Sequence, residues 1–131
     1  MQTTLQMLKT HPSATGIAPE NLAAAIAKLY TCAQACTTCA DACLGEKELS
    51  SLVPCIRANL DCADACLATG AMLSRVTHSP TDLLRSMLGT CVKACHQCAE
   101  ECAKHASMHE HCRICSEACR SCEKACRDLM G

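Results

Sequence analysis

Cysteine is the residue type with the greatest capacity for chemistry in this sequence. The chain has 16 cysteines among 131 residues, and most of them follow one another at intervals of three or four. They form four sets: Cys32, Cys36, Cys39 and Cys43; Cys55, Cys62 and Cys66; Cys91, Cys95, Cys98 and Cys102; and Cys112, Cys115, Cys119, Cys122 and Cys126. At about 100° per residue, each set falls on one stripe of an α-helix. Thiols therefore take the positions at which a bundle normally keeps leucine, isoleucine and valine, and the core itself becomes the candidate site.

Thiolate ligands select soft metals, which here means Cu(I), Zn(II) or an iron–sulfur cluster. Zn(II) requires four ligands in a closed tetrahedron, and rigid helical stripes supply these less readily than loops do. Cu(I) accepts two or three thiolates, and two cysteines four residues apart on one helix face can supply two. If each thiolate bridges two ions, one Cu(I) per cysteine leaves the core neutral. The sequence therefore favours many Cu(I) ions per chain, and a protein that carries iron–sulfur clusters or buffers zinc remains the alternative.

A second group of soft or borderline ligands continues these stripes at one end. Imidazole nitrogen and thioether sulfur both bind copper. The group lies between the third and fourth cysteine sets and consists of His105, Met108, His109 and His111. We expect these side chains to add metal contacts where the stripes reach the surface.

The opposite end of each stripe is apolar. In an antiparallel bundle these residues meet at the end away from the histidines. They are Leu22, Ile26, Leu29, Met72, Leu73, Val76, Leu84, Met87, Leu88, Leu129 and Met130. The sequence thus predicts a dry plug at one end and a mouth lined by soft ligands at the other.

Proline, glycine and serine signals position the helices that carry the stripes. Pro19 suits a first helical turn and Gly45 suits the end of a helix. Ser50, Ser79 and Ser107 are candidate N-caps, the last within a capping box with Glu110 three residues later. The long helices are expected at residues 19–44, 51–76, 80–106 and 108–129, behind an N-terminal segment and connector at 1–18. We predict a single all-α domain, an antiparallel four-helix bundle with a short extra N-terminal helix and a cysteine-lined core.

Composition excludes several other classes of function. The chain has 12 basic and 13 acidic residues, which gives no electrostatic case for binding nucleic acid or an anionic membrane. No apolar run approaches the ~20 residues that span a bilayer. The first residues lack an apolar signal segment, so a cytoplasmic protein with reduced thiols is expected. No nucleophile is paired with a histidine and a carboxylate, and there is no phosphate loop, so we expect no enzymatic activity.

The sequence resembles the copper storage proteins, in particular the type without an export signal. The motifs that carry the resemblance span nearly the whole chain: CAQACTTCADAC, CADAC, CVKACHQCAEEC, CRICSEACRSCEKAC and HASMHEH. The resemblance implies Cu(I) storage in the core, assembly into a homotetramer, and a copper entrance at His105, His109 and His111. One departure is Asn59, which occupies the position that would complete the cysteine spacing between Cys55 and Cys62.

Overall fold

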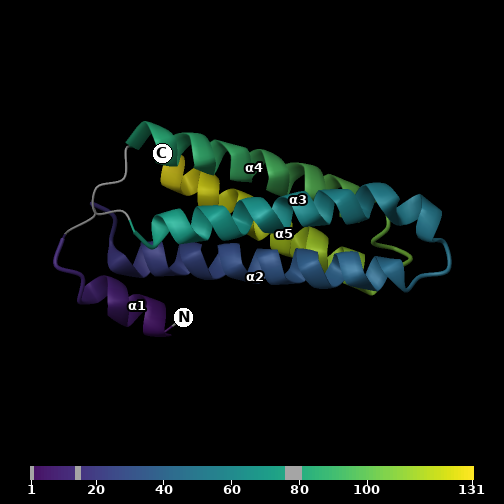
Figure 1. Ribbon diagram of the computed structural model, residues 1–131, viewed down its shortest axis with the longest axis horizontal. Helices are drawn as coiled ribbons and strands as arrows, with labels where there is room; N and C mark the ends of the chain where they lie inside the picture. Colours follow the sequence, from purple (N-terminus) through teal and green to yellow (C-terminus); the bar gives the residue numbers. More distant parts are fainter. Residues whose placement is uncertain (1, 14–15, 76–80) are drawn as a thin grey trace.

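The structure is a computed structural model that describes residues 2–13, 16–75 and 81–131. These residues form five helices and no strand: α1 (Gln2–Lys9), α2 (Pro19–Leu44), α3 (Leu49–Leu73), α4 (Thr81–Ala103) and α5 (Glu110–Met130). Helices α2 to α5 run alternately up and down as a bundle, and α1 lies beside the start of α2 (Figure 1). The predicted all-α bundle with a short N-terminal helix is confirmed. Within the described ranges, none of the helices combines the length and hydrophobicity needed to cross a membrane.

The bundle has two distinct ends. The α2–α3 and α4–α5 connections lie together at the right of Figure 1, whereas the start of α2 and the end of α5 lie at the left. Each helix packs against its two neighbours, because α2 and α4 both contact α3 and α5. The inner faces of four helices therefore meet along one axis. The end with the α2–α3 and α4–α5 connections is called the connection end, and the end with the start of α2 and the end of α5 is called the terminal end.

The first long helix begins and ends where the sequence predicts. Pro19 is its first residue, since proline lacks an N–H that the first turn would leave unpaired. Gly45 follows its last residue and donates its N–H to the carbonyl of Ala42 at 3.0 Å. Gly45 has a φ of −88°, so the helix ends without the left-handed conformation for which glycine is usually selected.

The serine caps predicted for the other helices are wrong where the structure describes them. Helix α3 begins at Leu49, so Ser50 lies inside it. Helix α5 begins at Glu110, and His109 takes the N-cap position in place of Ser107. His109 is held there because its buried side chain is anchored by carboxylates across the bundle end.

The ends of the two middle helices also differ from the predicted ones. Helix α4 ends at Ala103, and residues 104–108 form turns, so His105 does not extend the helical stripe. Helix α3 ends at Leu73, before the predicted end at Val76. Val76 and the predicted cap at Ser79 and Pro80 lie outside the described residues.

The apolar plug forms at the terminal end of the bundle. Leucine and isoleucine side chains there are at most 4% exposed: Leu22, Ile26, Leu29, Leu73 and Leu88. Leu84, Leu129 and Met130 pack against them as partly buried neighbours. Met72 and Met87 are only half-buried, at the edge of the plug. The described members of the predicted plug thus close this end with hydrocarbon.

Candidate metal centre

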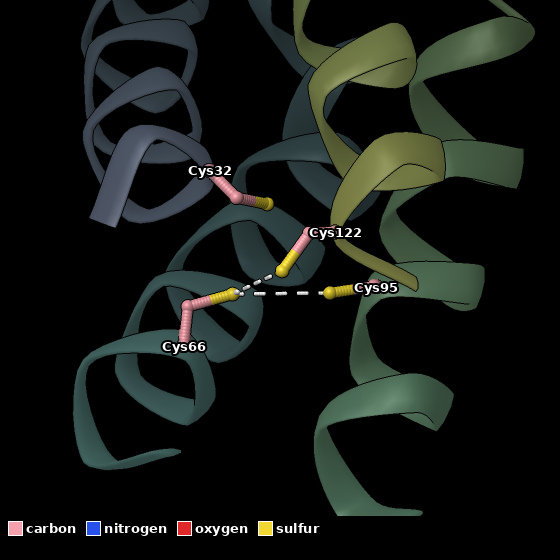
Figure 2. A group of neighbouring side chains, drawn as sticks. All are labelled: Cys32, Cys66, Cys95 and Cys122. Atoms are coloured by element: carbon pink, nitrogen blue, oxygen red, sulfur yellow. Dashed lines mark hydrogen bonds between the residues drawn. The ribbon is translucent and has the colours of Figure 1, made fainter. Parts of the chain in front are cut away.

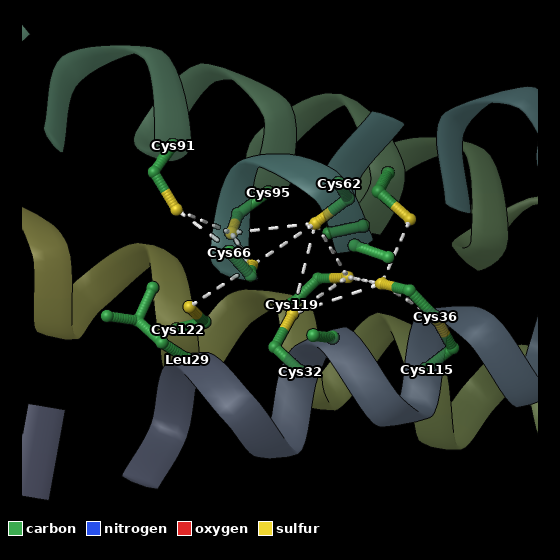
Figure 3. Close-up of a cluster of buried hydrophobic side chains, with 14 of the residues drawn as sticks. Leu29, Cys32, Cys36, Cys62, Cys66, Cys91, Cys95, Cys115, Cys119 and Cys122 are labelled. Carbon is green, nitrogen blue, oxygen red and sulfur yellow. Dashed lines mark hydrogen bonds between the residues drawn. The ribbon is translucent and has the colours of Figure 1, made fainter. Parts of the chain in front are cut away.

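All sixteen cysteines are free thiols, and each is at most 1% exposed. The stripes of α2, α3, α4 and α5 face one another, so sulfur atoms from different helices come into contact (Figure 3). Cys32 Sγ lies 3.9 Å from Cys62 Sγ of α3 and 3.8 Å from Cys119 Sγ of α5. Contacts of this kind continue along the bundle and form a sulfur tract between the plug and the connections.

The sulfur atoms gather in groups of three or four. Cys32, Cys66, Cys95 and Cys122 come from the four bundle helices, and their sulfurs all lie within 4.8 Å of one another (Figure 2). Cys66 Sγ is 3.8 Å from both Cys95 Sγ and Cys122 Sγ. The expectation that helical stripes supply four converging ligands poorly is therefore wrong. Rigid helices achieve this convergence because each contributes one sulfur to the same layer.

Neighbouring groups share their members. Cys32 belongs to the group just described and also to the group with Cys36, Cys62 and Cys119. Cys36 and Cys119 in turn belong to the next group along the tract. A sulfur atom in this arrangement can bind two ions at once, so the tract suits bridged ions better than separate four-thiolate sites.

At several positions of the tract, the protonated thiol is favoured in the absence of metal. Burial is the main cause that raises the pKa of Cys43 to about 11 and the pKa of Cys112 to about 12. Deeper in the tract, hydrogen bonding to Cys115 and Cys32, together with burial, raises the pKa of Cys119. A neutral core avoids the cost of burying thiolates that have no counterion. Each monovalent cation that enters can therefore replace one thiol proton.

Asn59 is fully buried and interrupts the sulfur stripe of α3. Its Oδ1 atom accepts hydrogen bonds from the thiols of Cys98 at 3.1 Å, Cys115 at 3.2 Å and Cys102 at 3.4 Å. Its Nδ2 atom donates to Cys55 Sγ at 3.8 Å. The buried amide is thus satisfied entirely by thiols, which explains how a polar residue is accommodated at a core position.

His111 is the histidine that the structure brings to the sulfur tract. Its Nδ1 atom lies 3.4 Å from Cys39 Sγ and 3.6 Å from Cys112 Sγ. With Cys43 these residues form a group whose ligand atoms lie within 4.8 Å of one another. The outermost layer of the tract therefore mixes imidazole nitrogen with thiol sulfur, as the sequence predicts for this end.

The other three predicted ligands lie at the rim. His109 is 8% exposed, with Nδ1 at 3.0 Å from Glu46 Oε2 and Nε2 at 2.9 Å from Glu48 Oε1. His105 Nε2 lies 3.7 Å from Glu101 Oε1. The Nε2 atoms of both histidines are buried and make no aligned hydrogen bond.

Met108 is 68% exposed, so its thioether faces solvent. In this structure the two rim histidines contact carboxylates, and the methionine side chain is exposed.

Comparison with known proteins indicates which of the soft metals is associated with such a tract. Residues 18–131 match the family of copper storage proteins. The chain belongs to this family. No curated protein matches the sequence significantly.

Solved structures of copper storage proteins are similar over nearly the whole chain. The copper storage protein Ccsp from Streptomyces lividans, loaded with 10 copper equivalents, is 49% identical, with a TM-score of 0.94 over 97% of each chain. A structure of a cytosolic copper storage protein from the same organism with five coppers is 53% identical. It has a TM-score of 0.83 and covers 85% of this chain and 92% of that one. The resemblance stated from the cysteine motifs is confirmed.

Within this copper storage fold, Glu46 and Glu48 are rim residues whose contacts with the histidines the sequence analysis missed. Both lie in the α2–α3 connection and reach His109 in the α4–α5 connection, and Glu46 also reaches His111 in the first turn of α5. The hydrogen bond with His111 is the main cause that holds the pKa of Glu46 below its usual range. An antiparallel bundle places these two connections at the same end, so acidic residues in one could have been paired with histidines in the other.

Proposed function

We propose that this protein stores Cu(I) ions inside its helical bundle. The observation that carries the proposal is the tract of sixteen free, buried thiols with sulfur contacts across all four bundle helices. Thiolate sulfur is a soft ligand, so such a tract binds soft metal ions in preference to hard, hydrated ones. Membership of the copper storage family supports the same conclusion.

We assign all sixteen cysteines as copper ligands because of the charge balance in the core and because neighbouring groups share sulfur atoms. A Zn(II) ion in an isolated group of four thiolates would leave two uncompensated negative charges in a buried layer. Cu(I) bound at one ion per thiolate leaves none. Because adjacent groups share sulfurs such as Cys36 and Cys119, bridging ions can fill the tract without excess charge.

Copper enters, on this proposal, between the α2–α3 and α4–α5 connections. Among the described residues, the opposite end is closed by buried leucine side chains such as Leu29 and Leu73, among which an ion would lose its hydration without gaining ligands. At the connection end Met108 is exposed, His105 and His109 follow at the rim, and His111 contacts the first thiols. An ion can therefore pass from one soft ligand to the next.

We propose further that the chain works as one non-enzymatic unit over residues 1–131, in the cytoplasm and as a homotetramer. The Streptomyces lividans relative described as cytosolic supports the location. An apolar groove on α2 and α3, lined by Tyr30, Ala33 and Leu67, offers a surface for self-association. Tyr30 is 41% exposed and Leu67 is 49% exposed. Light scattering during size-exclusion chromatography measures the assembly, and a monomer would contradict this part of the proposal.

The storage function is tested by anaerobic titration with Cu(I) against a chelator of known affinity. We expect a colourless protein that saturates at on the order of 16 ions per chain, since each thiolate bridges. Cys36→Ser should lower the saturation point, whereas Ser121→Ala on α5 should not change it. A brown protein containing iron, or saturation near four ions, would contradict Cu(I) storage and favour a cluster or a tetrahedral divalent metal.

A further inference from the structure

A single carboxylate links two histidines at the mouth. Glu46 Oε2 lies 2.9 Å from His111 Nε2 and 3.0 Å from His109 Nδ1. The two imidazole rings stack with their centroids 5.5 Å apart and their planes at 25°. Glu46 therefore holds one specific ring nitrogen of His111, on the side of the ring away from the sulfur tract.

The other ring nitrogen of His111 faces the thiols. Nδ1 lies 3.4 Å from Cys39 Sγ and 3.6 Å from Cys112 Sγ. A neutral imidazole carries one N–H, and the nitrogen opposite it carries a free lone pair. A carboxylate oxygen only accepts hydrogen bonds, so its contact with Nε2 requires the proton on Nε2. The lone pair then lies on Nδ1, directed toward the sulfur layer.

We propose that Glu46 is a positioning residue that fixes His111 in the Nε2–H tautomer, so that Nδ1 is ready to take Cu(I) together with Cys39 and Cys112. The part of this proposal that concerns copper rests on the proposed storage function, whereas the part that concerns the tautomer applies to the metal-free protein. A carboxylate that accepts the far N–H of a ligating histidine also orients the ring and strengthens the ligand. When an ion arrives, the Cys39 S–H bond breaks, a proton leaves to solvent, and a Cu–S bond forms beside Nδ1.

Glu48 supplies the matched control. Its carboxylate lies 2.9 Å from His109 Nε2, at the same rim and on the same connection as Glu46. It is 43% exposed, compared with 32% for Glu46. Removal of Glu48 perturbs the charge and packing of the mouth while leaving the Glu46–His111 contact in place.

The tautomer is tested first, in the metal-free protein. We compare wild type, Glu46→Ala, Glu46→Gln and Glu48→Ala by NMR correlation of the His111 ring nitrogens and protons, at a pH where the ring is neutral. Wild type and Glu48→Ala should show Nε2–H, and Glu46→Ala should shift toward a mixture of tautomers. Glu46→Gln should retain Nε2–H, because its amide oxygen still accepts. Nδ1–H in wild type, or an unchanged tautomer in Glu46→Ala, would overturn the proposal.

Copper binding is tested second, by chelator competition during the addition of Cu(I). Glu46→Ala should weaken binding to the layer that contains His111 by about 10–100-fold, the usual effect of losing such a partner, without changing total capacity. Equal weakening in Glu48→Ala, or a loss of capacity in Glu46→Ala, would show a general effect on the mouth and refute the assignment. If no variant binds Cu(I), the storage function fails, while the tautomer result still stands by itself.

Discussion

Loading this protein with Cu(I) should release one proton per ion. Sixteen thiols lie in the core with at most 1% exposure, and burial raises the pKa of Cys43 to about 11 and that of Cys112 to about 12. At pH 7, a thiol with a pKa four units higher is ionised in about one molecule in 10⁴. Thiols of this kind keep their protons until copper arrives and release them as it binds.

The expected magnitude follows from the number of thiols. Addition of about 16 Cu(I) ions should release about 16 protons, after which further ions on histidine or methionine should release none. Cys119→Ser should lower both end points by about one, because a serine hydroxyl neither ionises nor binds soft metal.

The assay is an anaerobic titration in weak buffer, with Cu(I) supplied in a neutral-ligand complex and proton release followed by a pH indicator. A divalent ion in closed thiolate sites would instead release several protons per ion and saturate near four ions. A release well below one proton per Cu(I) would refute the reasoning, since it would show that the thiols are already ionised in the metal-free core.

Three further predictions concern the two ends and the fold. The triple variant His105→Ala, Met108→Ala and His109→Ala should exchange copper with a chelator more slowly than wild type, at nearly unchanged capacity; wild-type rates would place the entrance elsewhere. Leu73→Ala should lower the unfolding free energy of the metal-free protein by about 2–5 kcal/mol in denaturant titrations, because Leu73 is fully buried. Copper exchange should not accelerate in that variant, and a sharp acceleration would mean that ions pass through the plug. The pKa of Cys112 is raised from 9.0 to about 12, so its contribution to the free energy of unfolding should be complete below pH 9 and lost as the pH rises toward 12. Denaturation midpoints of the reduced, metal-free protein measure this loss. Midpoints that rise with pH over this range would contradict the expected sign.

The interior of this protein could be predicted from the sequence, because one rule governs it. Side chains three and four residues apart share a helix face, so the cysteine spacing identifies both the helices and their buried sides. The same rule placed Leu22 and Leu29 in the plug. Asn59 fell at a stripe position, and the structure confirms that it is buried there.

The connections could not be predicted in the same way, because their conformation depends on contacts between segments far apart in the chain. Ser107 is of a residue type that commonly caps helices, yet His109 takes the N-cap position of α5. It does so because Glu46 and Glu48 hold its imidazole from the other connection at the mouth. His111 approaches the sulfur tract for the same reason. Local sequence preference is weak at such positions, and a few buried polar contacts between connections decide the geometry.

The double use of the thiols, as core and as ligands, bears on how this protein can evolve. A mutation that removes one cysteine leaves a gap or an unsatisfied hydroxyl in a layer with no exposure, and so weakens the fold as well as the metal store. Selection for a chain that folds then preserves storage capacity even during generations in which copper is scarce. Asn59 shows what a replacement requires: a residue other than cysteine is accommodated on a stripe where neighbouring thiols satisfy its polar atoms. The number of copper ions that related proteins can store should therefore differ by single cysteine positions at which neighbouring thiols can satisfy the new side chain, and not by gradual loss of the whole tract.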